Sequence, residues 1–125
     1  MKTFSIALLI LAGAGFLGFG LWLTADPASG LATIGIAAGN AAGLIELRAL
    51  YGGLELGLGV YLLMCAARAD WRRTGLWAVL LGNGGIGLIR LAGIASTGVF
   101  VPFFAYALIW ELGFAALAGW TLLRS

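Results

Sequence analysis

The chain contains no histidine, a single cysteine (Cys65) and a single lysine (Lys2). The lack of histidine excludes Ser-His-Asp triads, histidine-ligated metal sites and histidine-ligated haem, and one cysteine excludes CxxC redox chemistry and an internal disulfide. A retinal-type Schiff base needs an intramembrane lysine, whereas Lys2 stands at the N-terminus. We therefore expect no metal site and no cofactor.

Charge is also scarce. Charged residues make up 10% of the 125 residues and hydrophobic residues 62%, with a mean hydropathy of +1.08. A soluble domain averages about 45–50% apolar and about 25% charged residues, and disorder requires low hydrophobicity with high charge. Both classes are excluded, and the composition predicts a small integral membrane protein.

Four apolar stretches are long enough to cross a bilayer, which needs about 20 residues for a ~30 Å hydrocarbon core. They are residues 4–23, 44–67, 74–95 and 99–123. None shows the alternation of a β-barrel strand, so we predict an all-α four-helix membrane bundle that forms one domain over residues 1–125. The first stretch exceeds the 7–15-residue core of a secretion signal, and we expect it to be a genuine span.

The loops set the orientation and the helix ends. The loop and terminal cations gather on one side of the predicted bundle, so the positive-inside rule predicts that both termini are cytoplasmic. These cations are Lys2, Arg68, Arg72, Arg73 and Arg124. Asp26, Asn40 and Asp70 precede helical stretches and are predicted N-caps. Residues 27–39 are expected to form a short outer-surface helix or a re-entrant segment.

Two Glu-Leu-Gly triplets suggest an internal duplication. They begin at Glu55 and Glu111, each about 11 residues below the outer end of its span. Two hairpins of equal orientation would form a parallel repeat about an axis normal to the membrane. Chance is the alternative, because leucine and glycine are abundant here.

The polar residues within the spans are the candidates for function, since a charge at the bilayer centre costs roughly 2.5–3.5 kcal/mol. Glu55 and Glu111 are expected ~16 Å below the outer surface, with Asn83 at a comparable level. Arg48 and Arg90 lie only four to five residues below the surface. We therefore predict a deep Glu/Asn layer beneath a shallow arginine layer.

Helical spacing groups these residues by face. Arg48, Tyr51 and Glu55 share one stripe, as do Asn83 and Arg90 with the intervening Gly87. Glu111 shares its stripe with small residues at 107, 115 and 118. Gly53 and Gly57 form a small-xxx-small pair expected to pack against a neighbouring helix.

Two interpretations of this cluster stay open. In the first, it is a pocket or pathway in which arginines attract a polar or anionic head group and the glutamates bind or exchange a proton. In the second, the same residues form an interhelical hydrogen-bond network that only holds the helices together.

The segment from Glu46 to Gly59 carries an Arg-x-x-Tyr-Gly-Gly motif at Arg48, Tyr51, Gly52 and Gly53. This motif, with the helix count and spacing, resembles the bacterial family called domain of unknown function 4345. The resemblance implies an inner-membrane protein but no activity, because the family has none established. More distantly, the layout resembles DoxX-like four-helix proteins, some of which associate with quinone-linked oxidoreductases.

Three functional hypotheses follow. The first is a binding or transport module for a hydrophobic or weakly acidic small molecule, using Glu55, Glu111, Asn83, Arg48, Arg90 and Tyr51. The second is a structural or accessory subunit of a larger membrane complex. The third is an intramembrane acid/base enzyme, although no nucleophile or cofactor motif supports it. Lipid bilayer contact and a homo-oligomer or larger assembly are expected, and a nucleic-acid partner is not.

Overall fold

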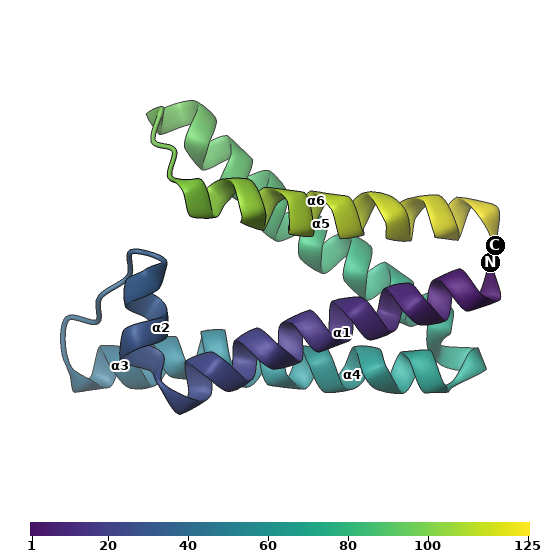
Figure 1. The fold of residues 1–125 in the computed structure, drawn as a ribbon, viewed down its shortest axis with the longest axis horizontal. Helices are drawn as coiled ribbons and strands as arrows, with labels where there is room; N and C mark the ends of the chain where they lie inside the picture. Colours follow the sequence, from purple (N-terminus) through teal and green to yellow (C-terminus); the bar gives the residue numbers. More distant parts are fainter. The chain divides into compact units, whose positions relative to one another are not determined.

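The computed structural model describes all 125 residues and contains helices but no strand (Figure 1). Four helical stretches are long and apolar enough to cross a membrane, and they are Lys2–Ala25, Ala41–Ala67, Ala69–Thr97 and Pro102–Arg124. The prediction of an all-α protein with four such helices is confirmed. In chain order the elements are α1 (Lys2–Ala25), α2 (Pro27–Thr33), α3 (Ala41–Arg48), η1 (Ala49–Leu54), α4 (Glu55–Ala67), η2 (Ala69–Trp71), α5 (Arg72–Thr97) and α6 (Pro102–Arg124).

The second long stretch is not a uniform α-helix. Between α3 and α4 the chain forms η1, a π-helix of six residues from Ala49 to Leu54. A π-turn is wider than an α-turn, so side chains after it are rotated relative to those before it. This segment contains the Tyr-Gly-Gly part of the sequence motif, at Tyr51, Gly52 and Gly53.

Side-chain hydrogen bonds cap the starts of two helices. The Asn40 Oδ1 accepts a 2.8 Å hydrogen bond from the Gly43 amide at the start of α3, and Asp26 accepts a 3.4 Å bond from Ser29 at the start of α2. These two predicted N-caps are confirmed. The prediction for Asp70 is wrong, because α5 begins one residue later than this cap requires: Trp71 takes the N-cap position, without a side-chain cap bond.

The chain divides into two compact units. One is the Leu11–Leu63 unit. The other, which we call the hairpin unit, combines Met1–Ile10 with Met64–Ser125.

In the Leu11–Leu63 unit, glycines bring the backbones of α1 and α4 into contact. A Cβ atom added to Gly59 would lie 2.7 Å from the Leu17 nitrogen and 2.8 Å from the Gly13 oxygen. One added to Gly20 would lie 2.8 Å from the Leu56 nitrogen. Only glycine permits such an approach, which is how membrane helices gain van der Waals contact without a hydrophobic driving force.

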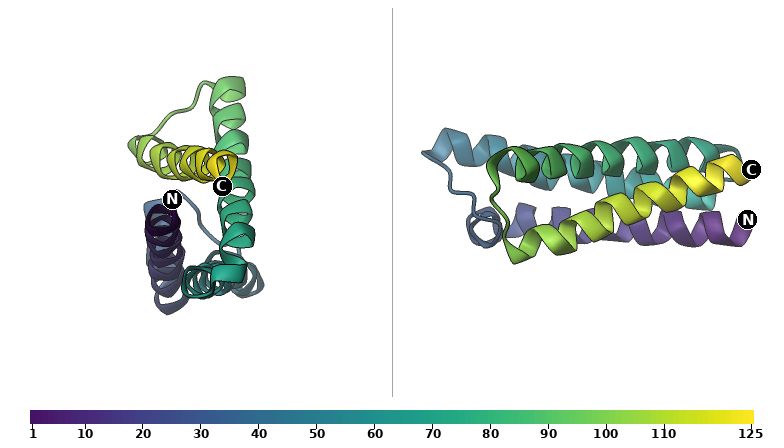
Figure 2. Two further views of the ribbon diagram at one scale, coloured as in Figure 1. Left: turned by 90° about the vertical axis from the view of Figure 1, so that its right-hand side faces the viewer. Right: turned by 90° about the horizontal axis from the view of Figure 1, so that it is seen from above.

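In the hairpin unit, α5 and α6 are joined by residues 98–101 and cross each other (Figures 1 and 2). They meet where Gly87 leaves room for Leu112, since a Cβ on Gly87 would lie 2.6 Å from a Leu112 methyl carbon. The Phe4 ring packs edge-on against Trp120, with 5.6 Å between the ring centroids. This contact brings the N- and C-terminal ends of the chain together at one end of the hairpin unit.

Candidate functional site

An ion pair joins α5 to α6. The Arg90 Nε donates to the Glu111 Oε2 at 3.1 Å, and the Arg90 Nη2 donates to the Glu111 Oε1 at 2.7 Å. This two-point geometry is the strongest form of arginine–carboxylate contact, and it fixes both side chains in orientation as well as distance. The side chain of Glu111 is 10% exposed and that of Arg90 is 25% exposed.

Small residues let Glu111 reach this position. Glu111, Ala115 and Ala118 are all buried along one face of α6, as their spacing predicted. Opposite them, Gly87 lies so close to α6 that an added Cβ would be 3.3 Å from the Glu111 Cβ. The hairpin is therefore already packed tightly around the ion pair by residues without charge.

The predicted separation of arginine and glutamate into two layers is wrong for Arg90 and Glu111, which touch. The reason is where the helices end. The predicted spans place Arg90 five residues and Glu111 twelve residues from the loop that joins them. In the structure α5 extends to Thr97 and α6 begins at Pro102, so these distances become seven and nine residues. The offset between Arg90 and Glu111 along the helix axes therefore falls from seven residues to two. Two residues correspond to about 3 Å, a distance that the arginine side chain can span.

Aromatic rings complete the surroundings of Arg90. Its guanidinium carbon lies 5.6 Å from the ring centroid of Phe103 and 5.7 Å from that of Phe104. Both distances fall within the range of cation–π attraction. The guanidinium is thus held between a carboxylate and two rings at the start of α6.

Asn83 lies two turns along α5 from Arg90, on the same face as predicted. It is 1% exposed, and Gly87 between the two is also buried. The Asn83 Nδ2 atom is buried and has no hydrogen-bond partner. A buried amide donor without a partner costs about 1–3 kcal/mol, and no protein group satisfies this one.

Arg48, Tyr51 and Glu55 belong to the Leu11–Leu63 unit. The Arg48 Nε donates a 2.8 Å hydrogen bond to the Thr24 carbonyl oxygen near the end of α1. Tyr51 and Glu55 are half-buried, and the Glu55 Oε2 atom is itself buried. Because η1 widens the turn between Arg48 and Glu55, a regular 100° step per residue does not describe their relative directions. The signal that sequence reasoning missed is this π-helix at the Tyr-Gly-Gly motif.

Gly53 and Gly57 make no close helix contact within the Leu11–Leu63 unit, and their predicted packing against a neighbouring helix stays a prediction. A Cβ added to either meets no atom within 4 Å. Their neighbours Gly52 and Gly59 make the close contacts instead, Gly52 with Thr24 and Gly59 with Leu17. The difference follows from helix geometry, because only one face of the continuous helix formed by η1 and α4 can point toward α1.

Glu55 and Glu111 lie in different compact units. Their predicted association therefore stays a prediction, as do the internal duplication and the cytoplasmic location of the termini.

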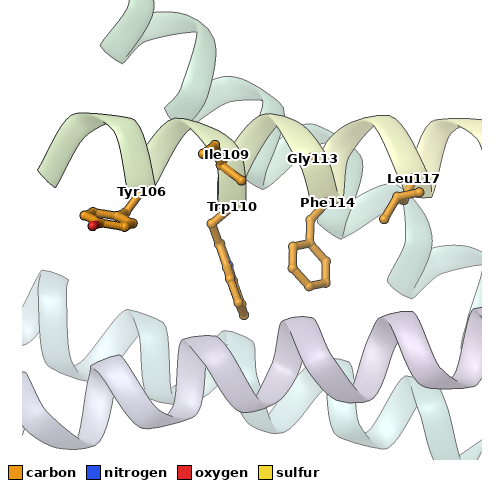
Figure 3. A pocket seen from close by; sticks show the side chains of 6 residues that line it. All are labelled: Tyr106, Ile109, Trp110, Gly113, Phe114 and Leu117. Carbon is orange, nitrogen blue, oxygen red and sulfur yellow. The ribbon is translucent and has the colours of Figure 1, made fainter. Parts of the chain in front are cut away.

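A second feature of the hairpin unit is an aromatic face on α6. Figure 3 shows Tyr106, Trp110, Phe114 and Leu117 on one side of this helix, around a shallow depression of about 400 Å³. The Trp110 and Phe114 ring centroids are 4.5 Å apart. No charged side chain lines the depression, so this face offers apolar contact but no acid–base chemistry.

The helices define the class of the protein: it is all-helical, with four helices of membrane-spanning length and composition and an ion pair between the last two. The family is shown by comparison, since the model of the domain of unknown function family DUF4345 matches residues 5–122. The chain belongs to this family. No curated protein and no solved structure matches the chain.

Proposed function

We propose that this protein is a membrane-embedded binding or transport module for a hydrophobic or weakly acidic small molecule, with the Arg90–Glu111 ion pair as its anchor. The two-point ion pair between two spans is the observation that supports the proposal. Ionisable residues inside spans are costly, with each charge at the bilayer centre costing roughly 2.5–3.5 kcal/mol, and they are commonly functional.

Stability alone gives a weak reason for the pair. Replacing a buried ion pair by well-packed apolar residues is often neutral or stabilising. The hairpin is also held by uncharged contacts, including Gly87 with Leu112 and Gly84 with Ala115, where an added Cβ would lie 3.7 Å from the Ala115 Cβ. An oriented guanidinium and carboxylate are, by contrast, what recognition of a polar head group requires.

Asn83 adds a second polar group to the same proposal. Its buried Nδ2 donor suits a ligand oxygen, and it lies on the same face of α5 as Arg90. Glu55, Arg48 and Tyr51 form a further candidate set in the Leu11–Leu63 unit, where Arg48 already donates to Thr24. We assign them a supporting role in binding or proton exchange.

We place the protein in the bacterial inner membrane with both termini cytoplasmic, since the loop and terminal cations gather at one end of the predicted bundle. Four short helices enclose little volume, so a homo-oligomer or a larger complex is the expected working form.

Direct binding tests the proposal. The full chain is reconstituted in nanodiscs, and saturable binding is measured for a panel of radiolabelled lipophilic acids, alcohols and amines. The Arg90→Gln/Glu111→Gln double variant keeps the net charge and the volume of the side chain at position 111, and we expect it to lose binding of the acid or alcohol. The control is Arg73→Gln, because Arg73 is exposed and its hydrogen bond to the Ser125 Oγ, at 3.3 Å, is exposed as well. Absence of saturable binding, or equal binding by the double variant, would overturn the proposal.

A role as an accessory subunit is the second candidate, and two open glycines favour it, one in η1 and one in α4. Gly53 and Gly57 meet nothing within 4 Å, and small-xxx-small pairs are a common surface for association of membrane helices. Under this alternative, Gly53→Leu releases a co-purifying partner, whereas the Arg90→Gln/Glu111→Gln variant retains it.

A further inference from the structure

Beside Arg90, the hairpin unit has an open groove of about 800 Å³. It runs along the half of α5 nearest the 98–101 loop and ends at the start of α6. The residues that matter for its chemistry are Gly85, Ile89, Arg90, Gly93, Thr97 and Phe104. Arg90 is its only charged residue, and Thr97 directs its hydroxyl to the Gly93 carbonyl at 2.7 Å.

Two glycines make the groove hollow. A Cβ added to Gly85 or Gly93 meets no atom within 4 Å, in contrast to Gly87 on the same helix, which is filled by Leu112. The missing side chains therefore leave space that no other part of the hairpin unit occupies. Isoleucine and phenylalanine walls make this space suitable for a hydrocarbon chain.

The depth of Arg90 limits the head group that can reach it. Arg90 lies seven residues, about 10 Å, below the end of α5 at Thr97. The head group of a two-chain phospholipid stays in the interfacial layer outside the hydrocarbon core. A molecule with one chain and a small head group can enter the core and bring that group to Arg90.

The ion pair determines the charge of such a ligand. Arg90 and Glu111 together carry no net charge, so a ligand that arrives already ionised would add an unbalanced charge in a medium of low dielectric constant, which is costly. A carboxylic acid arriving in its neutral form avoids this cost, and after losing its proton it can bind Arg90 in the same two-point geometry as Glu111.

We infer that the groove binds a single-chain lipophilic carboxylic acid, an inference that rests on the function proposed above. The acid reaches the groove from the lipid phase and replaces Glu111 as the partner of Arg90. The acid O–H bond breaks and its proton passes to a Glu111 oxygen, forming a new O–H bond there. The resulting ligand carboxylate pairs with the Arg90 guanidinium. The site is neutral before and after the exchange, and no other reactant is needed.

Photoaffinity labelling tests where the acid binds. The probe is palmitic acid carrying a diazirine on its chain, added to the full chain in nanodiscs of zwitterionic lipid, with labelled residues identified by mass spectrometry. We expect labels on residues lining the groove. Unlabelled palmitic acid should compete about tenfold or more better than its methyl ester, which has no proton to give.

Glycine variants provide the matched pair. Gly93→Leu places a side chain in the groove, where a Cβ meets no atom within 4 Å, and keeps both residues of the ion pair. We expect it to lower labelling about tenfold or more. Gly82→Leu is the control, because a Cβ at Gly82 also meets nothing within 4 Å but Gly82 does not line the groove. Near-ultraviolet circular dichroism verifies that each variant is folded.

Infrared difference spectroscopy tests the proton exchange. With palmitic acid labelled with carbon-13 at its carboxyl group, binding should give a labelled carboxylate band and an unlabelled protonated-carboxyl band from Glu111. The second band should be absent from the Arg90→Gln/Glu111→Gln variant. A labelled band from a protonated ligand would refute the exchange.

The outcomes separate this inference from the function on which it rests. If labelling depends on Arg90 but not on Gly93→Leu, or if the methyl ester competes equally, the single-chain acid in the groove is wrong and the proposed function survives. Equal competition by dipalmitoyl phosphatidylglycerol would assign the groove to a lipid head group and overturn the inference. Absence of any Arg90-dependent binding would overturn both.

Discussion

Gly57 and Gly59 lie two residues apart on α4 and offer a matched test of helix packing. The perturbation is alanine at each position in turn. At Gly59, the new methyl group would lie 2.7 Å from the Leu17 nitrogen and 2.8 Å from the Gly13 oxygen, both backbone atoms of α1. At Gly57, it meets nothing within 4 Å.

The expected difference in stability between Gly59→Ala and Gly57→Ala is the steric cost of the methyl group at position 59. Both substitutions gain the same preference of alanine over glycine in a helix, about 1 kcal/mol, so this gain cancels when the variants are compared. Overpacking costs about 1–3 kcal/mol. Because backbone atoms cannot turn aside as a side chain can, we expect Gly59→Ala to be less stable than Gly57→Ala by an amount near the upper end of this range.

The assay is reversible unfolding by sodium dodecyl sulfate in bicelles, followed by tryptophan fluorescence, with thermal unfolding as a second measurement. A difference of about 3 kcal/mol corresponds to roughly 12 °C in the unfolding midpoint for a chain of this size. Gly57→Ala should equal or exceed the wild-type free energy of unfolding. Equal stability of the two variants would refute the assigned face of α4 and the contact between Gly59 and α1.

Three further predictions concern polar groups. Glu111→Gln leaves Arg90 without its counter-charge and should lower the free energy of unfolding by about 3 kcal/mol, whereas the Arg90→Gln/Glu111→Gln double variant should lose much less. Asn83→Leu removes a buried donor that has no partner and should be neutral or stabilise by about 1–2 kcal/mol. Asn40→Ala removes the 2.8 Å cap bond to Gly43 and should cost about 1 kcal/mol. All three are measured by the same unfolding titration.

Each of these has an outcome that contradicts it. A double variant as unstable as Glu111→Gln would mean that the ion pair itself stabilises the hairpin. A strong loss of stability in Asn83→Leu would mean that the amide has a bonding partner, such as a water or a bound molecule. For Asn40, the matched control is Glu46→Gln, a change at an exposed residue of the same helix, which should leave stability unchanged. Equal stability of Asn40→Ala and Glu46→Gln would contradict the stabilising role of the cap.

Local properties of the sequence were sufficient to predict the membrane-spanning helices and two of the N-caps. Long apolar runs predict membrane-spanning helices because every backbone polar group must be satisfied within the segment. The cap at Asn40 is equally local, since its partner Gly43 is three residues away. Spacing along one helix also predicted the buried face of α6, with Glu111, Ala115 and Ala118.

The contacts between helices were decided by tertiary structure. The Arg90–Glu111 pair depends on the register of α5 against α6, and a shift of two or three residues at each helix end changed the expected offset from seven residues to two. Spacing also could not tell which glycines of η1 and α4 pack against α1. The pattern pointed to Gly53 and Gly57, whereas the face toward α1 carries Gly52 and Gly59, because the choice depends on the partner helix and on the π-turn before it.

The sequence by itself therefore determined the number and kind of membrane-spanning helices and the set of polar residues worth testing, since these follow from composition and short-range spacing. The family was recognised by the resemblance of the Arg-x-x-Tyr-Gly-Gly motif and shown by the match over residues 5–122. Only the tertiary structure decided which of those polar residues touch, because contact between two helices depends on side chains far apart in the sequence. It joined Arg90 to Glu111, bonded Arg48 to Thr24, and left the groove along Gly85 and Gly93 open.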